Sequence, residues 1–339
     1  MPQGLSTIIL PWQGDDGEGG LGPVTVLRLV ITRILLSVLT LLIVSIAIFA
    51  IIEVLPGDVA TRMLGRDATP AAIAVFREKM HLNDPAVVRY VHWLGGILHG
   101  DFGQALTSSR PIADILAPRI FNTLLLSIYA FLIYLPLALI PALVQASHRD
   151  RQVDHVISVI NLVFLSTPDF LLGTVLLLAF TVALPLFPAV SMLDDNSSAL
   201  EYLRAMTLPA VTLAIAMAIA AVRMLRDNLI EVLDSDYVRM AELKGLPRRA
   251  VLLRHALPNA LVPTLNITAI NLGYLVGGVV IVEKVYSYPG FGRLMIDALQ
   301  LRDVPLIEAT VLIASTVYVG ANMLADVGAI LLNPRLRKG

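Results

Sequence analysis

Long apolar stretches separated by short polar segments dominate this chain. Six of them reach or approach the roughly 20 residues that a helix needs to cross a bilayer core. They run over 34–55, 123–146, 156–183, 205–222, 260–282 and 309–332. Pro136, Pro141 and Pro168 fall inside these stretches, where they predict kinks rather than helix ends. The pattern predicts an all-α integral membrane protein with six transmembrane helices.

The positions of Lys and Arg predict how the helices are oriented. Basic residues gather before the first stretch, between the second and third, between the fourth and fifth, and after the sixth. Because cytoplasmic loops carry such an excess, these segments and both termini are predicted to be cytoplasmic. We divide the chain into a flexible cytoplasmic tail (1–29), a first transmembrane helix with an external segment (30–118), a five-helix core (119–332) and a cytoplasmic C-terminus (333–339).

Composition supports a membrane protein and narrows the chemistry. The chain is 57% hydrophobic and only 15% charged, against about 25% charged in soluble domains. It has no cysteine, so it has no disulfide or thiol nucleophile. A net charge of −1 gives no sign of a nucleic-acid partner. Phosphate-loop, zinc-protease and nucleophile-turn motifs are also missing from the sequence. We therefore predict no catalytic residue, no metal site and no bound cofactor.

The most informative polar segment lies between the fourth and fifth stretches, at about 224–258. Its pattern over 236–244 predicts a helix with apolar and charged sides. Gly245 is placed to end that helix, because glycine adopts the left-handed conformation without a steric penalty. Pro247 is placed to start a second helix. One interpretation is an amphipathic connector lying at the lipid headgroups.

A second interpretation comes from the motif spacing. The segment resembles the coupling loop of binding-protein-dependent ABC importer permeases, with Gly245, Leu257 and Pro258 at the family spacing and Ala241 at its second alanine. The run Asp-Tyr-Val-Arg, then Ala, then Lys-Gly-Leu is similar to the peptide, dipeptide and nickel branch, the oligopeptide permease B-like proteins. His255 departs from the isoleucine of the family consensus. The resemblance implies that the ATPase contact includes Tyr237, Arg239, Ala241, Lys244, Gly245, Arg248, Leu257 and Pro258.

Further motifs extend this resemblance over nearly the whole chain after the tail. They occur in the family's order at 55–58, 82–85, 100–103, 109–111, 166–168, 288–292 and 333–335. Any one of these Gly and Pro clusters could be a simple turn. Their order along the chain is what supports the resemblance.

The resemblance implies a type I ABC importer fold in a bacterial inner or plasma membrane. Expected partners are the lipid bilayer, a second homologous permease, two cytoplasmic ATPase subunits that use ATP and Mg, and an extracytoplasmic solute-binding protein. The implied function is uptake of peptides or related small solutes, such as opines, glutathione-like compounds or nickel chelates, by alternating access.

Polar residues inside apolar stretches are candidates for the translocation path, because charge in a membrane is costly. Asp169 follows Pro168 about half-way along the third stretch. We also include Pro168, Asn271 and Glu283 among the candidates. The alternative for Asp169 is a carboxylate bonded to kinked backbone or to a partner subunit. For the fifth stretch around Asn271, the alternative is close helix packing.

Two other functions stay open at this point. A proton-coupled secondary carrier could use Asp169 as its proton site, but inverted repeats are not visible in the loop pattern. A membrane anchor or sensor without transport would leave the motif spacing of the segment at 224–258 unexplained.

Overall fold

The computed structural model describes residues 23–54, 69–79, 83–191 and 198–332. Most of the predicted tail, the C-terminal segment 333–339 and the motif at 55–58 lie outside these ranges. Within them every regular element is a helix, and the sole bridge pairs Gln104 with Pro111.

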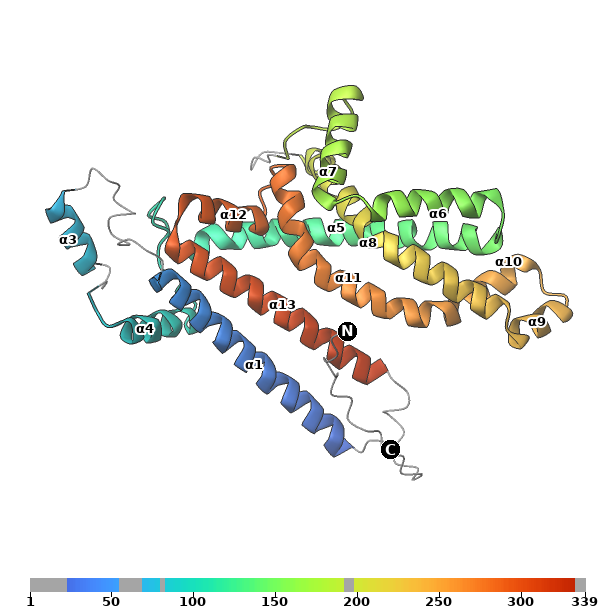
Figure 1. Ribbon diagram of the computed structural model, residues 1–339, viewed down its shortest axis with the longest axis horizontal. Coiled ribbons are helices and arrows are strands. Elements are labelled where there is room, and N and C mark those ends of the chain that lie inside the picture. Colours follow the sequence, from blue (N-terminus) through green and yellow to red (C-terminus); the bar gives the residue numbers. More distant parts are fainter. Residues whose placement is uncertain (1–22, 55–68, 80–82, 192–197, 333–339) are drawn as a thin grey trace, which may run out of the picture.

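The helices follow one another without an intervening sheet (Figure 1). They are α1 (Pro23–Val54), α3 (Pro70–Lys79), α4 (Ala86–Leu98), α5 (Ile112–Ser147), α6 (Gln152–Leu165), α7 (Asp169–Leu177), α8 (Ala199–Leu233), α9 (Asp236–Leu243), α10 (Arg248–Ala250), α11 (Leu257–Val285), α12 (Phe291–Leu301) and α13 (Val304–Leu332). Two π-helical turns, η1 (Leu178–Ala183) and η2 (Val251–Ala256), extend α7 and precede α11.

The core lies where α5, α8 and α11 pack together. Buried residues of α5 recur every fourth position at Leu126, Ala130, Tyr134, Ala138, Ala142 and Ala146. A similar row on α8 contains Met206, Ala210, Ala214, Ala218 and Val222. Positions four apart share one helix face, and small side chains let helix backbones approach closely in a membrane. The alanine rows therefore explain why α5 and α8 lie against each other.

Four helices are long and apolar enough to cross a membrane: α1, α5, α8 and α13. A bent pair, α6 with α7, raises the number to five. Helix α11 has 29 residues and covers the predicted fifth stretch. The predicted count of six transmembrane helices therefore stays a prediction, while the all-helical membrane fold is confirmed.

The third apolar stretch differs from the expected kinked helix. Its two halves, α6 and α7, bend by 106° at 166–168. Pro168 disfavours helical backbone in the preceding residue and cannot donate an N–H. Thr167 donates its hydroxyl to the Val163 carbonyl and its N–H to the Phe164 carbonyl, which satisfies acceptors at the end of α6. The helix is thus interrupted at 166–168, where only a kink was expected.

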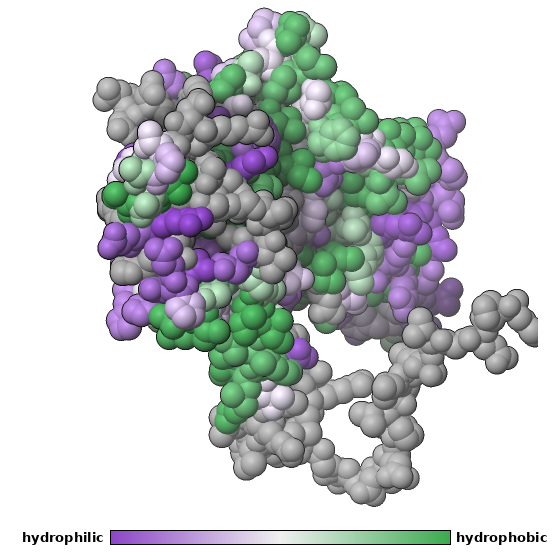
Figure 2. Space-filling model, turned by 60° about the vertical axis from the view of Figure 1, so that its left-hand side comes forward, coloured by the Kyte–Doolittle hydropathy of each residue, from purple (hydrophilic) through white to green (hydrophobic). Residues whose placement is uncertain are grey.

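Much of the molecular surface is apolar. Only 6% of the most apolar window of α1 is buried, and its Leu35 and Ile51 are more than 60% exposed. In Figure 2, hydrophilic residues gather at the left and right margins, with hydrophobic surface over much of the area between them. Such a surface requires lipid or another protein chain against it.

Candidate functional site

The candidate coupling element, residues 234–258, begins with a short helix and a glycine stop. Helix α9 ends at Leu243, and Gly245 has a φ of +79°. The Gly245 N–H donates to the Glu242 carbonyl (2.9 Å), which closes the turn. A side chain at Gly245 would force an L residue into left-handed backbone. The helix and stop predicted from the sequence are both present.

The second helix of the element is not a short, separate one. Helix α10 runs through the π turn η2 directly into α11, where Pro258 occupies the first helical turn. Proline lacks an N–H and its ring crowds the carbonyl four residues earlier, which here belongs to Arg254 inside η2. We attribute the wider π turn to this crowding. Leu257 is half-buried against the core, whereas Pro258 is exposed.

Helix α9 has apolar residues on two faces. Val238 and Ala241 are buried against Val251 of η2. Tyr237, Met240 and Leu243 are 54%, 56% and 76% exposed, and the charged side chains of Arg239 and Lys244 are exposed beside them. Ala241, which the resemblance includes in the ATPase contact, is only 6% exposed and packs within its own chain. Its small size allows α9 to lie close to η2.

An aromatic pair also joins α9 to η2. The Tyr237 hydroxyl and the His255 Nδ1 are 2.8 Å apart, and the two rings meet edge to face with centroids 5.7 Å apart. His255 stands where the family consensus has isoleucine. The histidine at this position therefore has a contact partner, Tyr237, which the spacing of the motif alone did not reveal.

Two contacts fasten the coupling element to the α5–α6 turn. Arg149, in that turn, forms an ion pair with Asp234 (2.7 Å), directly before α9. The Arg248 guanidinium donates to the Ser147 carbonyl (3.3 Å) at the end of α5. The element therefore rests on α11, with which it is continuous, on the α5–α6 turn, and on Val232 and Leu233 at the end of α8.

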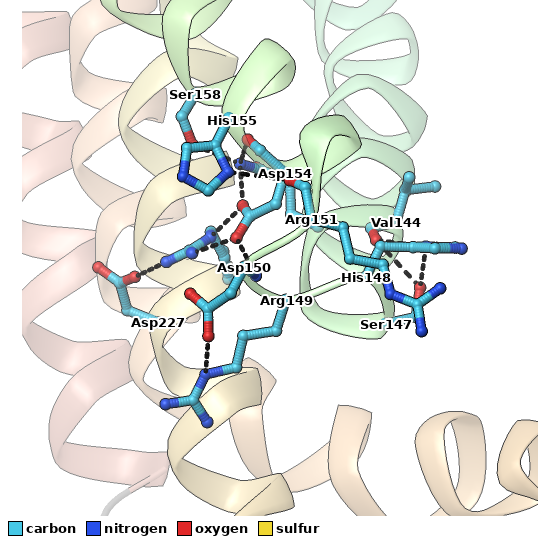
Figure 3. A network of polar contacts seen from close by, with 12 residues as sticks. Val144, Ser147, His148, Arg149, Asp150, Arg151, Asp154, His155, Ser158 and Asp227 are labelled. Atoms are coloured by element: carbon cyan, nitrogen blue, oxygen red, sulfur yellow. Dashed lines mark hydrogen bonds and ion pairs between the residues drawn. The ribbon is translucent and has the colours of Figure 1, made fainter.

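A buried ion network ties α5, α6 and α8 together at this end of the bundle (Figure 3). The Asp154 carboxylate, 2% exposed, accepts from Arg226 Nε (2.8 Å) and Nη2 (2.6 Å). It also accepts from the Asp150 N–H (3.1 Å) and Gln145 Nε2 (3.0 Å). A two-pronged guanidinium–carboxylate contact is among the strongest hydrogen-bonded pairs. The pair is not apparent in the sequence, because 72 residues separate the partners.

The candidate path residues lie in different surroundings. Asp169 is half-buried in the first turn of α7, directly after Pro168, and accepts a hydrogen bond from the Tyr274 hydroxyl of α11. Asn271 is 8% exposed and donates to the Met217 carbonyl of α8 (3.0 Å), which fits the helix-packing alternative.

Glu283 is fully buried at the opposite end of the bundle. It accepts from the Thr123 hydroxyl (2.5 Å) and the Arg293 N–H (2.9 Å), and a Cβ at Gly290 would overlap its carboxylate. The structure thus places Glu283 in the packing of α5 against the α11–α12 turn. Asp169 and Pro168, at the break between α6 and α7, stay candidates for the path. Across the described ranges, no group of three or more His, Asp or Glu side chains is placed to hold a metal ion.

A bundle of long apolar helices that carries a polar helical element at one end defines a multi-pass membrane protein. The chain belongs to the family of binding-protein-dependent transport system inner membrane components, whose model matches residues 134–338. A model of the N-terminal part of such components matches residues 26–127. The family resemblance noted in the sequence is thereby confirmed.

The chain matches several named relatives over nearly their whole length. A putative peptide transport system permease protein of Brucella abortus is 34% identical over 309 residues, which are 91% of this chain and 98% of the relative. The glutathione transport system permease proteins of Salmonella choleraesuis and Escherichia coli K12 are 34% identical over 311 residues, 92% of this chain and 99% of theirs.

Proposed function

We propose that this permease subunit forms the path by which an ABC importer takes up peptides or glutathione-like solutes. Its partners in this proposal are a second permease, two ATPase subunits that hydrolyse ATP, and a solute-binding protein on the outer side. The family and the names of the relatives support the solute class. Opines and nickel chelates are the other solutes that the sequence resemblance leaves open.

The observation that carries this function is the exposed face of α9. Tyr237, Met240 and Leu243 form an apolar strip on a helix whose opposite face is already buried. Such a strip beside exposed arginine and lysine suits an interface with another protein. Arg239, Lys244 and Arg248 flank it, and we assign the ATPase contact to this strip and its flanking charges. Ala241 contributes indirectly, by seating α9 on η2.

The attachments of α9 suggest how a push from the ATPases reaches the bundle. Movement of α9 passes through the Val238 and Ala241 contacts to η2, and from there into α11 without a break in the helix. It also passes through the Arg149–Asp234 ion pair to the α5–α6 turn. The α6–α7 break beside Asp169 then offers a place where two rigid parts can change their relative angle.

The experiment that tests the ATPase contact compares two arginine substitutions. Leu243→Arg changes the most exposed residue of the strip (76%), whereas Leu200→Arg changes a leucine that is 61% exposed at the other end of α8. In proteoliposomes with all partner subunits, Leu243→Arg should abolish ATPase binding and ATP-driven uptake. Leu200→Arg should leave both unchanged. Normal ATPase binding and uptake in Leu243→Arg would show that the strip is not the contact.

The same assay separates the importer from the alternatives. Uptake by an importer requires ATP and continues when an added protonophore collapses the pH gradient. Uptake that follows the pH gradient without ATP would favour the secondary carrier, and absence of any uptake with all partners present would favour an anchor or sensor.

Orientation is part of the proposal. We place the coupling element, the α5–α6 turn and both termini in the cytoplasm. Because the chain has no cysteine, single cysteines at Ala71 and Arg248 report position without background. An impermeant thiol reagent added outside intact cells should label position 71 and not position 248. The reverse pattern would overturn the assignment.

A further inference from the structure

A second feature at the α9 end of the bundle is an open groove of about 670 Å³. Its walls come chiefly from α6 and α8, with smaller contributions from α5 and α11. Leu162, Leu165 and Ile219 form apolar parts of the wall. Gln145, Asn161 and Arg223 contribute polar groups. The ion network of Figure 3 lies along one side of this groove.

Gln145 leaves an unpaired acceptor in the wall. The residue is 2% exposed, and its Oε1 has no hydrogen-bond partner among the described residues. Its Nε2 donates to the Asp154 carbonyl (3.3 Å), the Asp154 carboxylate (3.0 Å) and the Ser158 hydroxyl (2.9 Å). Rotating the amide by half a turn would press its oxygen against a carbonyl and a carboxylate. The amide orientation is therefore settled, and the bare Oε1 is an acceptor that requires a donor.

Arg223 contributes a cation whose charge is not committed elsewhere. It lies one helical turn before Arg226 on the same face of α8. Arg226 is bound to Asp154 and Asp227, whereas exposed Arg223 has no ion pair or hydrogen bond within the described part of the chain. Asp227, which also lines the groove, is 57% exposed and places a negative charge near the other end of this turn. The groove therefore presents the Arg223 cation about one helical turn from the Asp227 carboxylate, with the bare Gln145 acceptor in the same wall.

We propose that this groove is a binding subsite for a zwitterionic solute, such as a peptide, with its carboxylate on Arg223 and an N–H donor on Gln145 Oε1. A guanidinium binds a carboxylate through two parallel N–H bonds, and an ammonium or amide N–H supplies the donor that Gln145 lacks. The apolar wall formed by Leu162, Leu165 and Ile219 accommodates side chains of varied shape. This inference rests on the proposed function and adds a contact for the solute on the α9 side of the bundle.

The first test measures the electrostatics of the groove with a reporter cysteine. Leu162→Cys, at a groove position 61% exposed, is treated in the full complex with an anionic and a cationic methanethiosulfonate reagent. Replacing Arg223 with Gln should slow the anionic reagent and speed the cationic one, each by about fivefold for one unit charge about 4 Å away in water, so that the ratio of their rates falls by about twenty-five-fold. Arg204→Gln, at the opposite end of α8, is the control and should not change the ratio.

The second test asks whether a solute occupies the groove. Dialanine and S-methylglutathione are first tested for ATP-driven uptake, and the one that is transported is added during labelling of Leu162→Cys. It should slow labelling, and its carboxyl-amidated form should not. Arg223→Gln and Gln145→Leu should each remove the protection, and Arg223→Lys should restore part of it.

The outcomes separate the subsite from the transport function. A reporter inert to both reagents would mean a lipid-facing surface and would overturn the subsite. Unchanged protection in Arg223→Gln would do the same, as would an Arg223 effect seen only with anionic lipids, which would assign a lipid headgroup. In each case ATP-driven uptake by the wild-type complex would persist. Loss of the proposed function itself would appear earlier, as no ATP-driven uptake by the wild-type complex.

Discussion

Removing the guanidinium from the buried ion network should be among the most destabilising single changes at the α9 end of the bundle. Arg226→Met keeps a side chain of similar length but leaves the Asp154 carboxylate with only Gln145 and the Asp150 N–H as partners. Breaking a buried pair by removing one partner costs about 3–5 kcal/mol. Because the Arg226 side chain is 24% exposed and water can reach part of the site, we expect about 3 kcal/mol, the lower end of that range.

Arg149→Met is the matched control. The same substitution there removes an ion pair whose side chains are 47% and 64% exposed, and exposed pairs contribute little to stability because water and salt screen them. Denaturant unfolding of the purified permease, followed by far-UV circular dichroism, measures both. Adding Asp154→Asn to Arg226→Met neutralises the stranded carboxylate and should recover part of the loss. Equal destabilisation by the two arginine variants, or no recovery in the double variant, would refute the reasoning.

Three further changes test single positions by their effect on uptake and stability. Gly245→Val should reduce ATP-driven uptake at least tenfold while membrane insertion is normal, because a β-branched residue is poorly tolerated at a φ of +79°; normal uptake would contradict the need for this turn. Asp169→Asn keeps an acceptor for Tyr274 but removes the charge, so it should change solute preference in uptake assays without loss of assembly, whereas Tyr274→Phe should leave preference unchanged; identical uptake profiles would reduce Asp169 to a structural role. Gly290→Ala should lower the unfolding free energy by about 1–3 kcal/mol, since its Cβ would overlap the buried Glu283; an unchanged midpoint in denaturant would contradict that packing.

The membrane-spanning elements were largely predictable from the sequence, because the length of an apolar stretch has a direct physical meaning in a bilayer. Where the structure differs, local chemistry decided the outcome. At 166–168 the prediction was a kink, but the Thr167 hydroxyl and N–H satisfy the carbonyls of Val163 and Phe164 before Pro168, and the helix breaks outright. Helix α8 runs on to Leu233, well past the predicted end at 222, because leaving the apolar zone does not end a helix.

The polar contacts were much less predictable, since they depend on which helices become neighbours. Asp154 and Arg226 are both ordinary residues at the ends of apolar stretches when read in sequence. Only the packing of α6 on α8 brings them together. For Ala241, the motif indicated a role in coupling but not which way the side chain faces. Helix α9 has two apolar faces. The face that carries Val238 and Ala241 is the buried one, because it packs against Val251.

The Leu257-Pro258 motif marked the right segment, but it did not reveal how that segment is connected to α11. Gly245 as a helix stop and Pro247 as a helix start predicted two short helices, and Pro258 was used only as a match to the family spacing. In the structure the helix continues through Pro258. The π turn η2 lies directly before this proline, where its missing N–H and its ring would disturb regular α-helical hydrogen bonding. Two separate helices would let α9 move without displacing α11. A continuous helix with one wide turn instead carries that displacement into α11, and concentrates any bending at η2, where Tyr237 and His255 already join it to α9.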